Sequence, residues 1–179
     1  ASSYWYEIMA LNANRDSELQ LDGLSDCTKQ GDSVVKYIFS LLGVKSDFEL
    51  RDRIAPLKLK AHRCTLPRLD YDFTGSPDLA QTIVVACCAM GVHFRFTGLA
   101  TLKIKETDRI EALKRELRKV GYVIRDENDN TLIWEGETCE PNTVFTNRLK
   151  SFSSQPRSVT SLRVIRITAL FTFGGGLNT

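Results

Sequence analysis

Residues 105–109, Lys-Glu-Thr-Asp-Arg, separate an apolar-alternating run from an amphipathic helix. The run before them, residues 100–104, alternates apolar and polar side chains and is predicted to be extended. Residues 110–120 carry apolar side chains three and four positions apart, which is typical of a helix with one buried face. A strand-to-helix junction aims backbone N–H groups at the space above the helix start, so it favours anions. Because Lys105 and Arg109 add positive charge, we predict an α/β protein with an anion-binding junction; the other reading is a solvated, charged helix start.

Helical and extended patterns alternate along the first 140 residues. Helices are predicted over residues 3–11, 33–42, 79–90 and 110–120. Strands are predicted near residues 18–21, 48–51, 57–60, 68–71 and 92–96, followed by a hairpin of residues 122–125 and 131–134. This order suggests two similar units, each with a strand, a helix, a strand, a helix and a strand pair.

A second candidate for chemistry lies at the start of the helix predicted over residues 79–90. Ser76, Pro77 and Asp78 supply a cap, a proline suited to the first turn and an acid near the positive end of the helix dipole. An acid in that position stabilises a helix by about 0.3 to 1 kcal/mol without any functional role. Residues alone therefore favour a structural role for Asp78. His93 is likewise expected to be structural, since no serine or cysteine motif accompanies it.

Composition excludes several classes of protein. The net charge is only +2, from 24 basic and 22 acidic residues, which argues against nucleic acid or an anionic membrane as a partner. No apolar run reaches membrane-spanning length. The five cysteines form no C-x-x-C pair and have no histidine at metal-ligand spacing, so no bound metal is expected. An odd number of unpatterned cysteines fits a protein of the reducing cytoplasm. Without an initiator Met or a signal peptide, the chain is expected to begin inside a longer protein.

Residues 141–179 differ in charge from the rest of the chain. All 22 acidic residues lie at or before Glu140, whereas the tail carries only basic charges: Arg148, Lys150, Arg157, Arg163 and Arg166. A tail that binds nucleic acid is one reading, and it predicts steep salt dependence of binding. Basic residues this widely spaced make a poor electrostatic footprint, however, so we do not favour it.

Two separated motifs resemble the 5-enolpyruvylshikimate-3-phosphate synthase family. Residues 77–82, Pro-Asp-Leu-Ala-Gln-Thr, are followed 27 positions after Asp78 by the run at 105–109, and then by a helix ending at residues 117–121, Leu-Arg-Lys-Val-Gly. Residues 3–5 and 30–32 are also similar to the family's second half. The resemblance covers about residues 1–140. The related enolpyruvyl transferase acting on UDP-N-acetylglucosamine shares the architecture but lacks the Lys-Glu-Thr-Asp-Arg run.

The resemblance implies transfer of the enolpyruvyl group of phosphoenolpyruvate to the 5-hydroxyl of shikimate 3-phosphate, with no metal or organic cofactor. Asp78 would take the proton of that hydroxyl and Lys105 would contact it. Glu106 would give a proton to the methylene carbon of phosphoenolpyruvate and remove one later, while Arg109 would grip its phosphate or carboxylate. Thr101 stands at a substrate-contact position where many members have an amide side chain.

The resemblance also implies an incomplete fold: repeated βαβαββ units, as in the inside-out α/β barrel of these transferases. Residues 1–140 would be most of the second domain, while the first domain, which is needed to complete the cleft, is missing. The family's later Asp-His-Arg motif and final lysine have no counterpart after Glu140. We therefore hypothesise that residues 141–179 are non-native, the product of a frame change that the encoding nucleotide sequence would reveal. The isolated chain is expected to be inactive, and the full-length protein to be a cytoplasmic monomer. The alternatives are a relative of the UDP-N-acetylglucosamine enolpyruvyl transferase and a non-catalytic α/β interaction module.

Overall fold

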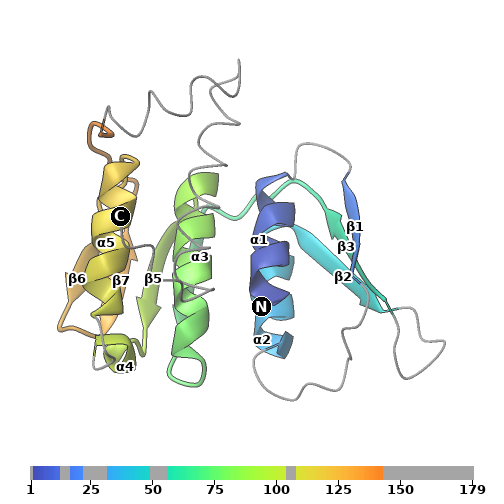
Figure 1. The fold of residues 1–179 in the computed structure, drawn as a ribbon, viewed down its shortest axis with the longest axis horizontal. Helices are drawn as coiled ribbons and strands as arrows, with labels where there is room; N and C mark the ends of the chain where they lie inside the picture. The colour runs from blue at the N-terminus through green and yellow to red at the C-terminus, as the bar shows by residue number, and fades with distance from the viewer. Residues whose placement is uncertain (1, 13–16, 22–31, 49–55, 104–107, 143–179) are drawn as a thin grey trace, which may run out of the picture. The chain divides into compact units, whose positions relative to one another are not determined.

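The computed structural model describes residues 2–12, 17–21, 32–48, 56–103 and 108–142, which fall into two compact units. Unit 1 comprises residues 1–66 and unit 2 comprises residues 67–179 (Figure 1). Among the described residues, no helix is long and apolar enough to cross a membrane. The structure is an α/β fold in which each unit has its own sheet and its own helices.

Unit 1 packs two helices against a three-stranded antiparallel sheet. Its elements are α1 (Ser2–Leu11), β1 (Glu18–Leu21), α2 (Asp32–Leu41), β2 (Val44–Phe48) and β3 (Leu57–Ala61). The strand order is β1-β3-β2. Met9, Phe39 and Leu59 are buried in its core, and the rings of Tyr6 and Phe39 lie 5.6 Å apart.

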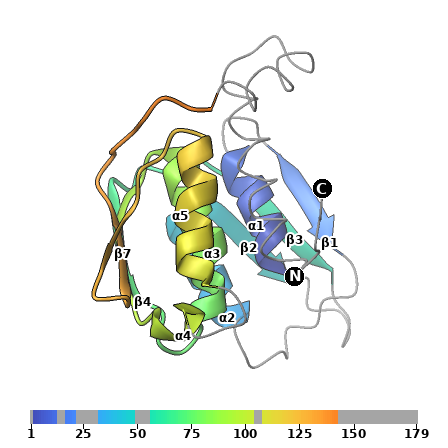
Figure 2. The same cartoon turned by 60° about the vertical axis from the view of Figure 1, so that its left-hand side comes forward.

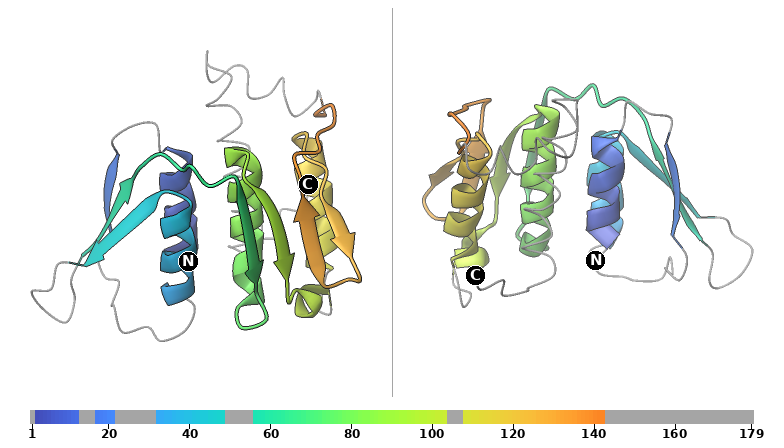
Figure 3. Two further views of the ribbon diagram at one scale, coloured as in Figure 1. Left: turned by 180° about the vertical axis from the view of Figure 1, so that it is seen from behind. Right: turned by 45° about the horizontal axis from the view of Figure 1, so that its top comes forward.

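Unit 2 is built on a four-stranded mixed sheet with the order β4-β5-β7-β6. Its elements are β4 (Arg68–Asp72), α3 (Pro77–Met90), β5 (His93–Thr97), α4 (Ala100–Lys103), α5 (Arg109–Lys119), β6 (Arg125–Glu127) and β7 (Thr131–Trp134). Strands β4 and β5 are parallel, whereas β7 is antiparallel to both β5 and β6. Figures 2 and 3 show α3 and α5 on the same side of this sheet.

The two faces of the unit 2 sheet differ along β5, because side chains alternate along a strand. Phe94 and Phe96 of β5 are fully buried and stack with ring centroids 4.5 Å apart. Arg95, between them, is exposed and pairs with Glu127 of β6 at 2.9 Å. On α5, the buried side chains are Ile110, Leu113 and Leu117, the stripe expected from the sequence. The helix side of the sheet is therefore the apolar core, and the other side carries the Arg95–Glu127 ion pair, although β7 is buried along its whole length.

The two units repeat the same arrangement of strands and helices. In unit 2 the order β4, α3, β5, α5, β6, β7 is the predicted βαβαββ unit, with the short helix α4 added. In unit 1, α1, β1, α2, β2 and β3 follow the same order without a described counterpart of β4. The sheet order β1-β3-β2 corresponds to β5-β7-β6. The predicted βαβαββ order is confirmed in unit 2, and unit 1 follows it from its first helix onward.

Three local predictions were wrong or shifted. Residues 100–103 form helix α4 rather than an extended run. The reason is a contact remote in sequence: the Ala100 N–H donates to Asn130 Oδ1 (3.0 Å) and the Leu99 N–H donates to the Asn130 carbonyl (3.1 Å). The strand expected at 48–51 begins earlier, at Val44, and residues 49–51 lie outside the described part of the chain.

The first strand of the predicted hairpin is also displaced. It was expected at residues 122–125, but β6 spans Arg125–Glu127, and the turn to β7 places Asn128 and Asp129 at φ 55°. Tyr122 instead forms a bridge with Thr138, and the Val123 N–H donates to the Glu137 carbonyl at 3.0 Å. Residues that follow β7 therefore take the pairing that local alternation had assigned to the hairpin.

Candidate active site

The candidate site lies where the two parallel strands of unit 2 end. In open α/β sheets, ligands bind beyond the carboxyl ends of parallel strands, where connections to helices diverge. The chain leaves β4 at Asp72 and enters α3 at Pro77, and it leaves β5 at Thr97 and enters α4 and then α5. Because Asp72 and Thr97 are register partners, the starts of these connections lie at the same sheet edge.

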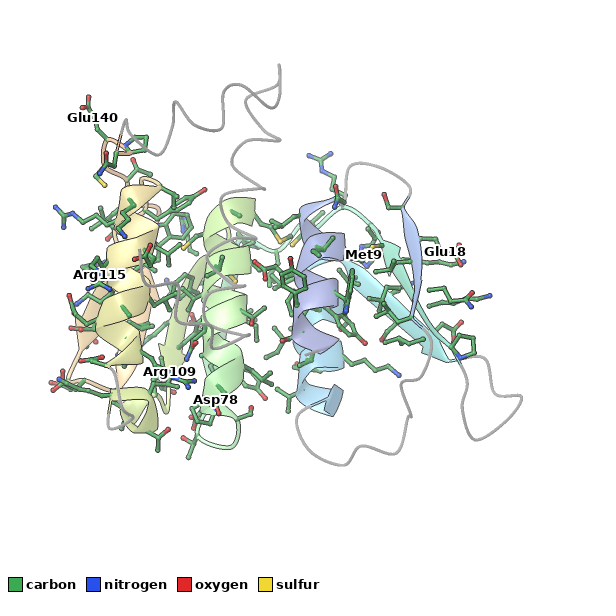
Figure 4. All side chains as sticks on the ribbon, in the orientation of Figure 1. Met9, Glu18, Asp78, Arg109, Arg115 and Glu140 are labelled. Atoms are coloured by element: carbon green, nitrogen blue, oxygen red, sulfur yellow. The ribbon has the colours of Figure 1, made fainter. Side chains whose placement is uncertain are left out.

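Asp78 and Arg109 meet at this edge. Arg109 Nη1 donates to Asp78 Oδ1 at 3.2 Å, although the two residues are 31 positions apart in sequence. The side chains are partly open to solvent, with 35% of Arg109 and 61% of Asp78 exposed. Figure 4 shows both residues at the same end of α3 and α5, whereas Arg115 lies further along α5. The structure therefore brings together one residue from each of the two sequence motifs.

Each of these side chains belongs to the first turn of a helix. Pro77 and Asp78 open α3, whose N-cap, Ser76, makes no side-chain capping hydrogen bond. Arg109 is the first residue of α5, and the N-cap Asp108 accepts a hydrogen bond from the Glu111 N–H at 3.0 Å. Asp78 is thus well placed for the helix dipole, whereas Arg109 places positive charge at the positive end of its helix.

Sequence reasoning missed the turn that connects β4 to α3. Asp72 Oδ1 accepts hydrogen bonds from the Thr74 N–H (3.0 Å) and from the Thr74 hydroxyl (2.6 Å). These hydrogen bonds, from the hydroxyl and the backbone of Thr74, lower the pKa of Asp72, and the Thr97 side chain contributes in the same direction. The Ser76 N–H then donates to the Phe73 carbonyl at 2.9 Å, so the chain turns directly into α3. The signal was the Asp-x-Thr spacing before Gly75, a pattern typical of an Asx turn.

Gly98 lies against this turn from the neighbouring strand. Its φ is +76°, and a Cβ added to it would come well under 3.0 Å from Thr74 N and Asp72 Oδ1. Only glycine combines this backbone conformation with so close an approach. The connection after β5 is therefore packed against the connection after β4, which fixes the edge where Asp78 and Arg109 meet.

Of the remaining predicted site residues, the structure describes Thr101 but not Lys105 or Glu106. Thr101 is exposed on α4, which is tied to the turn between β6 and β7 by Asn130 and by the ion pair of Lys103 with Asp129. That ion pair raises the pKa of Lys103. Lys105 and Glu106 lie outside the described residues, so their positions relative to Asp78 stay predictions. Within the described residues, no group of three or more His, Cys, Asp or Glu side chains could hold a metal ion.

A βαβαββ unit with an acid and a guanidinium at the carboxyl ends of its parallel strands defines the class: an α/β protein with a charged site at the sheet edge. Comparison with known families identifies which one. The model of the family EPSP synthase (3-phosphoshikimate 1-carboxyvinyltransferase) matches residues 9–175. The chain belongs to this family.

Curated relatives show the same similarity. A 3-phosphoshikimate 1-carboxyvinyltransferase from Bacteroides fragilis (strain YCH46) is 48% identical over 140 residues, which is 78% of this chain and 33% of the relative. The protein of that name from Bacteroides fragilis ATCC 25285 is 48% identical over 143 residues, 80% of this chain and 33% of the relative. One from Burkholderia orbicola (strain AU 1054) is 32% identical over 143 residues, covering 79% and 32%. The chain spans about a third of the length of the curated relatives it matches.

Proposed function

We propose that this chain forms one wall of an enolpyruvyl transferase site, which moves the enolpyruvyl group of phosphoenolpyruvate to the 5-hydroxyl of shikimate 3-phosphate. The observation that carries the proposal is the contact between Asp78 and Arg109, which joins the two family motifs at one sheet edge. Membership of the EPSP synthase family supports this substrate pair over UDP-N-acetylglucosamine. Family membership also supports an enzyme over a non-catalytic interaction module. Such a module would not require Asp78 to contact a residue of the second motif.

Asp78 and Glu106 would divide the proton transfers. Asp78 would accept the proton of the 5-hydroxyl as its oxygen attacks C2 of phosphoenolpyruvate, while Glu106 would protonate the methylene carbon. In the second step Glu106 would remove a proton from that carbon, so that the C–O bond to phosphate breaks and the enolpyruvyl double bond forms again. The departing phosphate would take the proton that Asp78 accepted, so both carboxyl groups would return to their starting states without a redox partner or a cofactor.

The cationic residues would hold the two anionic substrates. Arg109 would bind the phosphate or carboxylate of phosphoenolpyruvate through its fork of N–H donors, and Lys105 would lie against the reacting hydroxyl. Thr101 would supply a polar contact to the substrate from α4. Thr101, Lys105 and Arg109 are expected to act together because all three follow β5 within one stretch of chain, from the start of α4 to the start of α5.

The isolated chain is proposed to be inactive. Positioning and polarising two polyanions requires cationic groups on both sides of the cleft, and one sheet edge supplies only one side. The missing first domain would supply the opposing groups in a protein that we propose to be monomeric and cytoplasmic at full length. Phosphate release by this polypeptide alone, with both substrates present, would contradict this part of the proposal.

The non-native origin of residues 141–179 is a separate proposal. The family model continues to residue 175, whereas the alignments with the Bacteroides fragilis relatives cover 143 and 140 residues. A frame change after Glu140 predicts that another frame of the encoding nucleotide sequence contains an Asp-His-Arg segment. If no frame there contains one, the hypothesis of a non-native tail fails.

A chimeric enzyme tests the proposed chemistry. Residues 1–142 would replace the corresponding region of the Bacteroides fragilis relative, and phosphate release would be measured with both substrates. Asp78→Asn and Glu106→Gln are each expected to lower the rate by about 10²- to 10⁴-fold, the usual contribution of a positioned acid or base. Arg115→Gln, an exposed change further along α5, is the matched control and should leave the rate unchanged. A chimera that keeps full activity with Asp78→Asn would remove the base from the mechanism.

A further inference from the structure

The contact between Asp78 and Arg109 joins two groups whose proposed tasks are opposed. Asp78 is to take a proton from a hydroxyl, and Arg109 is to hold an anion, yet here they hold each other. We propose that this ion pair is the anion-free state of the site, and that a phosphate or carboxylate binding Arg109 displaces Asp78. The meaning of the exchange rests on the proposed function, but the exchange itself can be tested through the contact between these two side chains.

The geometry of the pair is that of a loose contact. It is made by a single nitrogen at 3.2 Å, whereas charge-assisted N–H···O bonds are typically about 2.7 to 2.9 Å long. Other arginines of unit 2 reach the shorter range: Arg95 to Glu127 and Arg125 to Glu137 both measure 2.9 Å. A guanidinium carries five N–H donors in a fork that suits an anion with two or three oxygens. A phosphate group can therefore make more bonds to Arg109 than Asp78 makes.

Solvent exposure keeps the pair weak enough to exchange. With 35% of Arg109 and 61% of Asp78 exposed, water screens their attraction. Exposed ion pairs measured by double-mutant cycles contribute about 0.2 to 1 kcal/mol. A contribution of about 0.4 to 1 kcal/mol within that range corresponds to an equilibrium constant of about 2 to 5 for the closed pair. An anion that competes with Asp78 would then be weakened only about three- to sixfold by the competition.

The helix dipoles favour exchange in one direction. Arg109 is the first residue of α5, where the helix dipole disfavours its positive charge, and an anion with more negative charge than the Asp78 carboxylate offsets this cost further. Asp78 belongs to the first turn of α3, so the positive end of that helix continues to stabilise its carboxylate after Arg109 is lost. Arg109 therefore gains from a stronger anion, while Asp78 keeps part of its stabilisation. The anion that engages Arg109 thereby releases from it the carboxylate needed for proton transfer.

NMR titration of the 179-residue chain with inorganic phosphate tests the exchange. The readouts are the Arg109 Nε–H resonance and the backbone amides at the starts of α3 and α5, followed at a constant ionic strength of about 0.15 M to hold screening fixed. Asp78→Asn removes the competing charge but keeps the side-chain shape. Glu111→Gln is the matched control, because it removes the same charge from the first turn of α5, where Glu111 pairs with Lys114 and not with Arg109. Arg109→Ala removes the anion-binding group.

Exchange predicts that Asp78→Asn tightens phosphate binding about three- to sixfold, while Glu111→Gln changes it less than twofold. If Asp78→Asn and Glu111→Gln have equal effects and Arg109→Ala still abolishes binding, the exchange is wrong but the anion site of the proposed function stands. If Arg109→Ala binds phosphate as the unmodified chain does, both ideas fail. Absence of binding to both the unmodified chain and Asp78→Asn also overturns the exchange.

Discussion

Replacing Gly98 by alanine directly tests the packing that forms the site edge. Gly98 follows β5 with φ +76°, a conformation that costs an L-residue about 1 to 2 kcal/mol. The new Cβ would also overlap with Thr74 N, Thr74 Oγ1 and Asp72 Oδ1, each well under 3.0 Å away. One of these atoms belongs to the backbone, so rotation of a side chain cannot relieve the overlap.

The expected loss is the sum of a conformational term and a steric term. Overpacking that forces backbone shifts costs about 1 to 3 kcal/mol. With the conformational cost, Gly98→Ala should lower the free energy of unfolding by about 2 to 5 kcal/mol. Gly91→Ala isolates the first term, because Gly91 has φ +73° at the C-terminal cap of α3 and a Cβ added there would have no neighbouring atom within 4 Å. This control should lose only about 1 to 2 kcal/mol.

Urea denaturation followed by circular dichroism measures both variants, with the m-value checking that the transition remains comparable. We expect the midpoint of Gly98→Ala to fall clearly below that of Gly91→Ala. Adding Asp72→Ala to Gly98→Ala should recover part of the loss, since it removes one of the overlapping atoms, and this makes the two changes non-additive. Equal losses for Gly98→Ala and Gly91→Ala would mean that the contact between the two connections does not constrain the fold.

Three further predictions concern other parts of the chain. Because hydrogen bonds from Thr74 lower the pKa of Asp72, its carboxylate should stabilise the fold above the ordinary value of 3.8 and lose that effect as pH falls through the lowered value. Asp72→Asn should therefore flatten the acid side of a stability-against-pH curve, and an unchanged curve would contradict this. Burial raises the pKa of the Cys88 thiol well above its usual range, so alkylation read by peptide mass spectrometry should label the half-buried Cys64 in the native protein but Cys88 only after unfolding. Leu117→Ala should cost about 2 to 5 kcal/mol in urea denaturation, because the side chain is fully buried on α5; a loss below about 1 kcal/mol would argue against that packing.

The spacing of apolar residues correctly predicted those elements that bury a single face. The helix over residues 110–120 was predicted well because its apolar stripe alone determines which side is buried. The error at residues 100–104 has a different cause: the backbone N–H groups of Leu99 and Ala100 bond to Asn130, which follows only after α5 and β6. Tyr122 pairs with Thr138 for a similar reason. Local alternation cannot reveal a pairing made by residues that come later in the chain.

The residues of the candidate site also differ in whether the sequence alone could reveal them. Arg109 was singled out because its charge stands at a helix start, whereas Asp78, for which the residues alone favoured a structural role, became a site candidate only through the family resemblance. Two parallel strands bring the two helix starts together. Asp72 and Gly98 were not found, since their importance lies in a contact between two connections rather than in the composition of either. A carboxylate whose hydrogen bonds are made within a turn leaves only the weak sequence signal of Asp-x-Thr.

The repeat gives a physical reason for where the site motifs fall. In unit 2, the run at residues 105–109 stands between β5 and α5; in unit 1, the corresponding connection joins β1 to α2, which begins at Asp32. Asp32, the last residue of the Gln-Gly-Asp segment that resembles the family, begins α2, and Arg109, the last residue of the run at 105–109, begins α5. A helix start provides oriented N–H donors whatever the side chains are, so the repeat supplies the same backbone electrostatics twice.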